Sequence, residues 1–257
     1  MELIFDHTLG KQEHQDLVIS PAMAIVDQDE EHEALDRGWL ALDHPIDKHT
    51  EVFYQSRSTR INLDLYKPRY KHHTHDGRDI DFKVIDASEM VKLLGLPHIY
   101  EQYMKRKEFT QDYDPFSHYH PRDQFMIFYL GTADNIVGFT KQKKYRYQED
   151  NYSTIDNFDS QDLAGLESVV HANTIPISHI TLDMEIQWAS DHFVRYFYMG
   201  SGYEQGSEYK ASYKGFEWWT GTEWSTNKKH YKRLCRRDSK LTEFSSLGNL
   251  SLIPDSL

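Results

Sequence analysis

Two arginines flank a short run of hydroxyl side chains in the first quarter of the chain, in the order Arg57-Ser58-Thr59-Arg60. A guanidinium group bonds carboxylate and phosphate oxygens in pairs, because its N–H donors form a planar fork. Neighbouring hydroxyl groups can add further donors to the same anion. The corner therefore predicts a clamp for a phosphate or carboxylate, with Arg57, Ser58 and Arg60 as binding residues. Two ordinary surface charges in an acidic protein are the alternative interpretation.

Three tryptophans lie close together in residues 216–224, which read FEWWTGTEW. Aromatic faces stack on nucleobases, sugars and amino acid side chains. We therefore expect Trp218 or Trp219 to form a platform for a substrate group. A hydrophobic flap that closes the edge of a sheet is the alternative.

The chain then becomes strongly basic. Residues 227–237 have the pattern of a helix, and it carries Lys228, Lys229, Lys232, Arg233, Arg236 and Arg237. A positive helix face of this kind is suited to the phosphates of RNA. A solvated face that balances nearby acids is the alternative.

Histidines are numerous, and the densest groups are His72-His73-x-His75 and His118-x-His120. A zinc site needs further ligands at defined spacing, and Lys71 beside the first group disfavours a cation. We therefore predict no metal site and no cofactor, and interpret these side chains as solvated loop histidines. The single cysteine, Cys235, excludes a disulfide within the chain and fits a reducing compartment.

Hydrophobic spacing indicates the elements that must position these residues. Small and polar residues at its start predict a helix over 178–192, with Ser178 as the N-cap and with Asp183 and Glu185 on the solvent side. Strands on either side of this helix, at 167–174 and 195–199, would make a βαβ pattern and a mixed sheet with helices on both faces. The other expected elements are an exposed helix at 27–36, two strands within 51–66, helices within 86–108, a strand pair at 124–130 and 135–145, and a polar loop at 146–165.

Bulk properties limit the possible functions. A length of 257 residues suits one large domain or two intimate lobes. The formal net charge of −12 repels nucleic acid at long range and disfavours wrapping of duplex DNA, although a local basic patch is compatible with it. The first ten residues lack the apolar run of a signal peptide, and the run near Phe125–Leu130 is too short to cross a bilayer. We expect a cytoplasmic protein without a membrane partner.

The order of strand, helix, and short strand entering a Gly-containing loop resembles the acyl-donor region of GNAT acyltransferases. A narrower resemblance is to the bacterial leucyl- and arginyl-type tRNA–protein transferases, which have Tyr-Leu-Gly-Tyr, Gly-Ser and Tyr-Lys-Ala segments after this helix. Here the similar segments are Tyr198-Met199-Gly200, Gly206-Ser207 and Tyr209-Lys210-Ala211. Fainter similarity upstream, at Arg37-Gly38-Trp39, Val52-Phe53-Tyr54, Arg60-Ile61 and 98–107, extends the resemblance over about residues 35–215.

The resemblance implies transfer of an aminoacyl group from aminoacyl-tRNA to an amine. That reaction needs an oriented carbonyl, a stabilised oxyanion and removal of a proton from the amine. Lys210 stands where the family keeps a lysine and could hold a phosphate or an acidic acceptor. Tyr198, Tyr203 and Tyr209 could donate hydrogen bonds, and either of the last two could protonate the leaving ribose oxygen. Asp183 could serve as the base or as an anchor for the amine.

The start of the 178–192 helix distinguishes between donors. GNAT enzymes cradle the pyrophosphate of acetyl-CoA with a Gly-rich turn, whereas residues 177–182 here read ISHITL, without glycine. Close approach of a pyrophosphate is therefore disfavoured. The helix end could still bind one phosphate or the 3′ end of an aminoacyl-tRNA through its N–H groups. Ser178, His179 and Thr181 are the binding residues predicted there, and Tyr198 and Gly200 are predicted to line the same site.

Two departures from the family lie at surfaces that could select donor or acceptor. The family has a cysteine cluster before the Arg-Ile pair, whereas this chain has residues 55–59, QSRST. The loop between Gly200 and Tyr209 is shorter than in the family and contains Glu204 and Gln205. The resemblance therefore supports the fold more strongly than it supports the substrate.

The sequence thus predicts an α+β protein with a GNAT-like mixed β-sheet flanked by helices. The predicted parts are an N-terminal lobe at 1–85 packed on a transferase core at 86–240, followed by a tail at 241–257. The predicted function is transfer of an aminoacyl or related acyl group from an activated donor, aminoacyl-tRNA, to an amine such as a protein N-terminus. Two alternatives remain open. One is an acyl-CoA-dependent N-acyltransferase, including one acting on a small molecule or modified nucleobase, and the other is a non-catalytic module that binds protein or nucleic acid.

Overall fold

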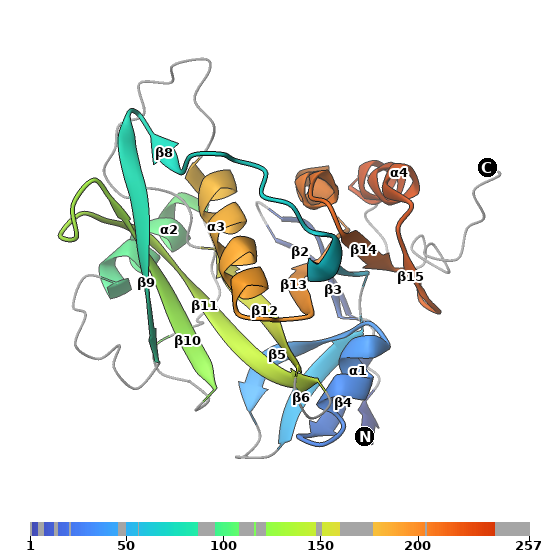
Figure 1. Ribbon diagram of the computed structural model, residues 1–257. Coiled ribbons are helices and arrows are strands. Elements are labelled where there is room, and N and C mark those ends of the chain that lie inside the picture. Colours follow the sequence, from blue (N-terminus) through green and yellow to red (C-terminus); the bar gives the residue numbers. More distant parts are fainter. Residues whose placement is uncertain are drawn as a thin grey trace. The chain divides into compact units, whose positions relative to one another are not determined.

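The protein is described by a computed structural model that contains antiparallel sheets together with helices, which confirms the α+β class (Figure 1). Its placed residues are 2–4, 8–12, 15–20, 22–45, 50–55, 57–86, 96–107, 116, 122–147, 151–159, 177–203 and 205–239. The predicted strand at 167–174, the helical segment at 87–95 and the predicted tail lie outside these residues.

The helices are α1 (Glu31–Asp36), η1 (Leu63–Leu65), α2 (Leu96–Lys107), α3 (Ile177–Asp191), η3 (Gln205–Ser212) and α4 (Lys228–Asp238). The strands are β1 (Glu2–Ile4), β2 (Thr8–Gln12), β3 (Gln15–Ser20), β4 (Ala22–Asp27), β5 (Trp39–Pro45), β6 (Thr50–Gln55), β7 (Ser58–Asn62), β8 (Thr74–His75), β9 (Arg78–Asp86), β10 (Asp123–Leu130), β11 (Ile136–Tyr147), β12 (Asn151–Asp159), β13 (Tyr196–Ser201), β14 (Phe216–Trp219) and β15 (Trp224–Ser225).

The chain forms two compact units, and each is assembled from segments that are distant in sequence. Unit 1 contains residues 1–66, 145–155 and 193–257, and unit 2 contains residues 67–144 and 156–192. This partition follows contacts in space, whereas the division predicted from the sequence used consecutive segments. The predicted boundaries at 85 and 240 stay a prediction.

Unit 1 contains two sets of hydrogen-bonded strands. One has the order β1-β4-β6-β5, and in the other the neighbours run β15-β14-β7-β13-β12. The two strands predicted around the basic corner are confirmed as β6 and β7, one in each set, and residues 58–61 of β7 are all buried. The core between these strands includes Phe53, Tyr145 and Tyr198, each with no exposed surface.

The predicted βαβ connection is present, but its first strand differs from the expectation. β12 pairs in parallel with β13, with Ser153 opposite Tyr196, and α3 lies between them in the chain. Residues 146–165 were expected to form a loop, and the prediction was wrong for β12. Asn and Asp disfavour strands on average, so the polar composition of 151–159 concealed the strand-forming Tyr152, Thr154 and Ile155.

A second correction concerns the expected helix at 27–36. The chain is still a strand up to Asp27, and the helix α1 begins only at Glu31. Gly38 follows α1 with a φ of +77°, and a Cβ atom there would lie 2.2 Å from Cγ of Trp219. A side chain at this position is therefore excluded both by backbone conformation and by packing.

Unit 2 contains the antiparallel strands β11-β10-β9-β8 and the helices α2 and α3. The predicted strand pair is confirmed, with Ile127 of β10 opposite Phe139 of β11. Ile180 and Met184 of α3 pack with Met126 and Phe128 of β10. The predicted helix over 178–192 is confirmed within one residue at each end.

The predicted solvent face of α3 is wrong. Asp183 and Glu185 have no exposed surface, and Ile180 and Met184 are buried as well. The reason is that α3 is covered on more than one side. A polar side chain on this helix therefore need not face solvent. No helix in the described part of the chain is both long and apolar enough to cross a membrane.

Candidate functional site

The end of β13 is held by side chains that bind its backbone carbonyls. Lys210 lies in η3 with its side chain buried, and its Nζ donates to the carbonyl oxygen of Met199 and, at 2.7 Å, to that of Ser201. Between them, the carbonyl oxygen of Gly200 accepts a 2.8 Å hydrogen bond from Oγ1 of Thr59. Lys210 therefore positions the loop that leaves β13. Its predicted role in holding a phosphate stays a prediction.

Replacement of Lys210 by methionine should lower the free energy of unfolding by about 2–4 kcal/mol, because two buried carbonyls would lose a charged donor. Urea unfolding followed by circular dichroism measures the change. Lys214→Met is the control, since Lys214 is an exposed lysine that lies just after η3. Equal unfolding midpoints for the two variants would show that the Lys210 ammonium does not hold β13.

Arg57 of unit 1 is fully buried, with no exposed surface. Its Nη2 lies 2.6 Å from Oδ2 of Asp238 at the end of α4, and Asp238 is also fully buried. Nη1 donates to the carbonyl oxygen of Gly202 at 3.3 Å, and the guanidinium carbon lies 4.6 Å from the ring centre of Tyr203. The Tyr203 hydroxyl accepts a 2.9 Å hydrogen bond from the Arg57 backbone N–H. Arg57 therefore ties β7, the β13 loop and α4 together.

Arg60 is enclosed by aromatic rings. Its guanidinium carbon lies 3.7 Å from the ring centre of Tyr196 and 3.8 Å from that of Trp224. Its Nε donates to Glu217 at 2.7 Å, and its Nη1 donates to the Tyr198 hydroxyl at 3.4 Å. Burial raises the pKa of Tyr198 above its usual value, although the Arg60 charge opposes this shift.

The arginines of the predicted clamp do bind carboxylates, as expected, but these carboxylates belong to the protein itself. Arg57 binds the carboxylate of Asp238, Arg60 binds that of Glu217, and the Ser58 hydroxyl donates to the carbonyl oxygen of Gly38. A role of these residues in substrate binding stays a prediction.

Two of the three tryptophan rings in residues 216–224 are buried, and Trp224 is half-buried. Trp218 and Trp219 are only 1% and 7% exposed. The indole N–H of Trp218 donates to the carbonyl oxygen of Asn227 at 3.2 Å, and its ring contacts His230. Trp219 packs edge-on against Trp224. The expected open platform is therefore corrected, because both rings are enclosed, and β14 is a strand of the sheet paired with β7.

Unit 1 brings most of the predicted site residues together around the end of β13. Tyr198 and Gly200 belong to β13, Tyr203 follows it, and Tyr209 and Lys210 lie in η3. Tyr203 and Tyr209 are both half-buried. Their assignment as catalytic residues stays a prediction.

The remaining predicted residues belong to unit 2. Asp183 accepts hydrogen bonds from the backbone N–H groups of Arg69 and Tyr70, each at 2.9 Å. His73 Nε2 lies 4.0 Å from the same carboxylate. The geometry therefore gives Asp183 a structural task, which is to fasten residues 69–70 to α3.

Ser178, His179 and Thr181 lie in the first turn of α3. The helix begins at Ile177, so Ser178 stands inside the first turn and not at the predicted N-cap position. The Thr181 hydroxyl donates to the carbonyl oxygen of Ser178 at 3.2 Å. Burial, together with the nearby Arg69 charge, lowers the pKa of His179.

The basic helix predicted at 227–237 is confirmed as α4. Asn227 is its N-cap, and its Oδ1 accepts a 3.0 Å hydrogen bond from the backbone N–H of His230. Tyr231, Leu234 and Cys235 form the buried side of the helix. The buried residues recur every three to four positions, which leaves the basic residues between them on the other faces.

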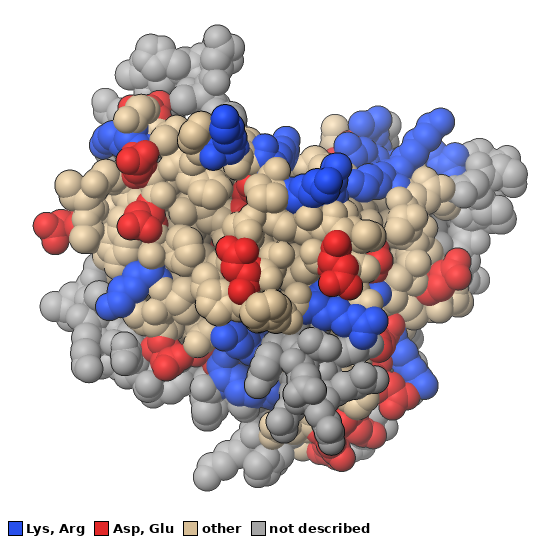
Figure 2. Space-filling model, viewed as in Figure 1, with Lys and Arg blue, Asp and Glu red and all other residues tan. Residues whose placement is uncertain are grey.

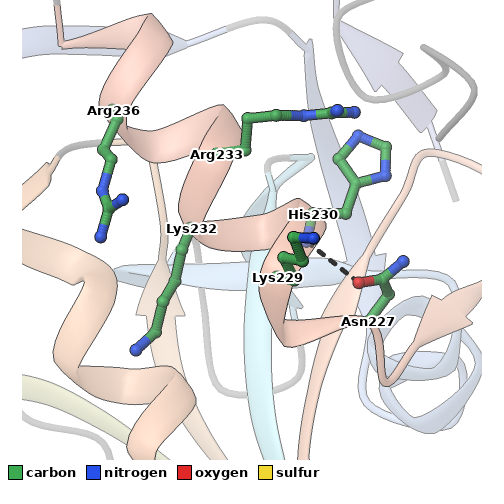
Figure 3. Close-up of a pocket in the computed structure, with 6 residues that line it drawn as sticks. All are labelled: Asn227, Lys229, His230, Lys232, Arg233 and Arg236. Atoms are coloured by element: carbon green, nitrogen blue, oxygen red, sulfur yellow. Dashed lines mark hydrogen bonds between the residues drawn. The ribbon is translucent and has the colours of Figure 1, made fainter. Parts of the chain in front are cut away.

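A pocket of about 580 Å³ opens beside the basic face of α4. Its described lining residues are Asn227, Lys229, His230, Lys232, Arg233 and Arg236. Lys232 and Arg236 extend in the same direction, one helical turn apart, whereas Arg233 and His230 extend to the other side of α4 (Figure 3). Figure 2 shows Lys and Arg side chains gathered on the surface where α4 lies. Four cations thus line one pocket in a chain whose net charge is −12.

The electrostatic field of this face is positive. Partial burial, and then the charges of Lys232 and Lys214, lower the pKa of Lys228. Four pairs of the pocket cations are three or four residues apart, namely Lys229/Lys232, Lys229/Arg233, Lys232/Arg236 and Arg233/Arg236. At these spacings like charges destabilise a helix by about 0.2–0.5 kcal/mol per pair. A positive face maintained against this repulsion is what an anion-binding surface requires.

Two acidic residues of this region were not singled out from the sequence. Glu208 forms a bidentate ion pair with Arg236, and Asp238 pairs with Arg57. A signal for Asp238 was present, because it is the one acid directly after the basic run 228–237. Glu208 carried no such signal, since it is adjacent to Arg236 only in the folded chain. Among the described residues, no group of three or more His, Cys, Asp or Glu side chains is arranged to hold a metal ion.

Comparisons with known proteins give no family. No protein-family model matches the chain, and no curated protein matches it. Among solved structures, the chain is similar to the C-terminal domain assigned to a lysylphosphatidylglycerol synthetase of Agrobacterium fabrum, with a TM-score of 0.38 and 7% identity over 72% of this chain and 56% of that one. It is also similar to an aminoglycoside acetyltransferase from an uncultured soil sample, with a TM-score of 0.30 and 10% identity over 45% of this chain and 75% of that one. The chain thus spans little more than half of the first of these, and likenesses at such TM-scores carry no argument about fold family or activity.

Proposed function

We propose that the protein is an acyl- or aminoacyltransferase whose donor carries phosphates, in the simplest case an aminoacyl-tRNA. The observation that carries the proposal is the pocket on α4, which Lys229, Lys232, Arg233 and Arg236 line together. Phosphate groups are the natural ligands of such a face, because Lys and Arg supply charge and Arg adds paired donors.

An RNA donor suits the balance of charge. The whole chain is acidic, so long-range repulsion disfavours indiscriminate contact with nucleic acid. A single basic helix concentrates the attraction at one surface, and each neutralised phosphate adds counterion release to the affinity. The protein would therefore bind RNA through α4, while its overall negative charge repels the rest of the RNA strand.

The transfer step is proposed from the sequence segments that resemble the tRNA–protein transferases. Two of them, 198–200 and 209–211, are adjacent at the end of β13, where Lys210 holds the carbonyls of Met199 and Ser201. η3 also contacts α4, since the Tyr231 hydroxyl donates to the carbonyl oxygen of Ser207 at 3.1 Å. The proposed phosphate site and the proposed transfer segment thus belong to the same unit. The acceptor is an amine, in the simplest case a protein N-terminus.

An acyl-CoA donor is the second candidate, and the size of the pocket favours it. A volume of about 580 Å³ lies in the range of small-molecule sites, and coenzyme A also carries phosphates. The glycine-free start of α3 weighs against it, because side chains in the first turn disfavour close approach of a pyrophosphate.

A single-turnover transfer assay tests the proposal. The full chain is mixed with a panel of tRNAs charged with radiolabelled amino acids, and with labelled acetyl-CoA in a parallel arm, each with peptide and small-molecule amines. We expect label to move from tRNA to an amine. Label moving from acetyl-CoA alone would establish the second candidate, and no transfer in any arm would favour a binding module without catalysis.

A further inference from the structure

The pocket on α4 contains a cation that already has a partner. Arg236 Nε lies 2.6 Å from one carboxylate oxygen of Glu208, and Nη2 lies 2.7 Å from the other. The Arg236 side chain is 63% exposed, whereas that of Glu208 is 16% exposed. The hydrogen bonds to Glu208 raise the pKa of Arg236. The carboxylate is therefore the more enclosed partner, and the arginine is the more exposed one, which lines the pocket.

A carboxylate and a phosphate offer Arg236 the same type of contact. Both accept two parallel N–H bonds from the guanidinium fork, and a phosphate adds a third oxygen and more charge. Glu208 occupies the edge of the fork formed by Nε and Nη2, so a phosphate competes with it for these donors and finds the arginine charge already partly neutralised. A ligand phosphate that binds this edge of Arg236 must therefore displace Glu208 from it.

We propose that Glu208 is an internal counter-ion that sets the affinity of the α4 pocket for phosphate. In the free protein it holds Arg236, and in the complex Arg236 turns to a ligand phosphate while Glu208 remains beside it and repels the ligand. The pocket thus selects ligands with enough phosphates to engage Lys229, Lys232 and Arg236 together. The assignment of the phosphate to a transfer donor rests on the proposed function, but the exchange of partners does not.

Lys232 favours the move of Arg236 from Glu208 to a ligand phosphate. It stands one turn before Arg236 on the same side of α4, so the two side chains can contact the same or consecutive phosphates (Figure 3). Glu208 weakens the mutual repulsion of this cationic pair in the absence of ligand. Removal of its charge should therefore leave the pocket more strongly positive and Arg236 available.

Binding measurements on the full chain test the proposal with Glu208→Gln. Fluorescence anisotropy with a labelled single-stranded RNA of about twelve nucleotides probes a phosphate strand, and competition by pyrophosphate and by coenzyme A probes soluble phosphates. We expect Glu208→Gln to bind at least one of these probes about fivefold more tightly than the wild type, the change that release of an exposed ion pair can give. Glu208→Ala, which leaves no amide to bond Arg236, should change affinity in the same direction.

A double-mutant cycle of Glu208 and Arg236 distinguishes release of Arg236 from a general change in the charge of the pocket. In an Arg236→Gln background, Glu208→Gln should give a much smaller gain than in the wild type. A gain for RNA alone would identify a strand as the ligand, and a gain for the soluble probes alone would identify a nucleotide cofactor. The proposal is overturned if neither Glu208 variant tightens any phosphate probe while both stay folded by circular dichroism, or if only poly-glutamate, the acidic-peptide probe, gains. Absence of transfer activity together with the expected binding pattern would refute the proposed function and leave this inference intact.

Discussion

Asp238→Asn is expected to lower the free energy of unfolding by about 3–5 kcal/mol, the usual loss when one partner of a buried ion pair is removed. The variant leaves the Arg57 guanidinium in place with no exposed surface and without its carboxylate. Its remaining contacts, the Gly202 carbonyl oxygen and the Tyr203 ring, offer partial charges only. Chemical denaturation monitored by tryptophan fluorescence measures the loss.

A double variant distinguishes an unpaired charge from lost packing. Arg57→Met with Asp238→Leu removes both charges, and replacement of a buried pair by apolar residues is often neutral or stabilising. It should therefore be more stable than Asp238→Asn alone. Asp134→Asn, in the exposed turn after β10, is the matched control and should be neutral. If Asp238→Asn were as stable as this control, the ion pair would not be the connection that holds α4 to β7.

Lys229→Glu combined with Lys232→Glu is expected to weaken RNA binding by about tenfold to a hundredfold near physiological salt. Two attractive contacts become repulsive, and the release of counterions from the neutralised phosphates is lost. The dependence of log K on log salt concentration should become shallower for the same reason. Fluorescence anisotropy with labelled tRNA over a salt series gives both quantities.

The same double variant should not destabilise the protein. Each new glutamate stands four residues before an arginine, Glu before Arg233 and Arg236, which is the favourable order on a helix. Acids in the first turns also suit the helix dipole. Lys67→Glu with Lys83→Glu changes the net charge equally at exposed positions of unit 2 and is the control. An equal loss of RNA affinity in the control would mean that overall charge, and not α4, governs binding.

The sequence predicted those elements whose pattern is local. The spacing of Ile180 and Met184 indicated α3, and the alternation around Arg57 and Arg60 indicated β6 and β7. β12 was missed because its residues are mostly polar, and strand pairing depends on a neighbour that composition does not reveal. The burial of Asp183 was missed for a similar reason: the backbone N–H groups that bind it come from residues 69–70, more than a hundred positions away.

The candidate site depends even more on contacts between residues that are distant in sequence. Arginine, tryptophan and lysine side chains were predicted to face a ligand, because their chemistry suits one. In the structure, Arg57, Trp218 and Lys210 bond partners within the protein. No local pattern distinguishes a side chain that binds substrate from one that binds its own fold. The basic face of α4 was predictable, since it depends on helical spacing within one segment, and Glu208 was not, since its partner is distant in sequence.

Amide hydrogen exchange with and without tRNA tests the central claim most directly, which is that α4 is the surface that binds the donor's phosphates. Protection should increase in α4 and in the adjoining η3, and the Lys229→Glu, Lys232→Glu variant should lose the effect at the same tRNA concentration. Protection confined to the first turn of α3, with exchange in α4 unchanged, would contradict the claim and return the donor site to Ser178, His179 and Thr181.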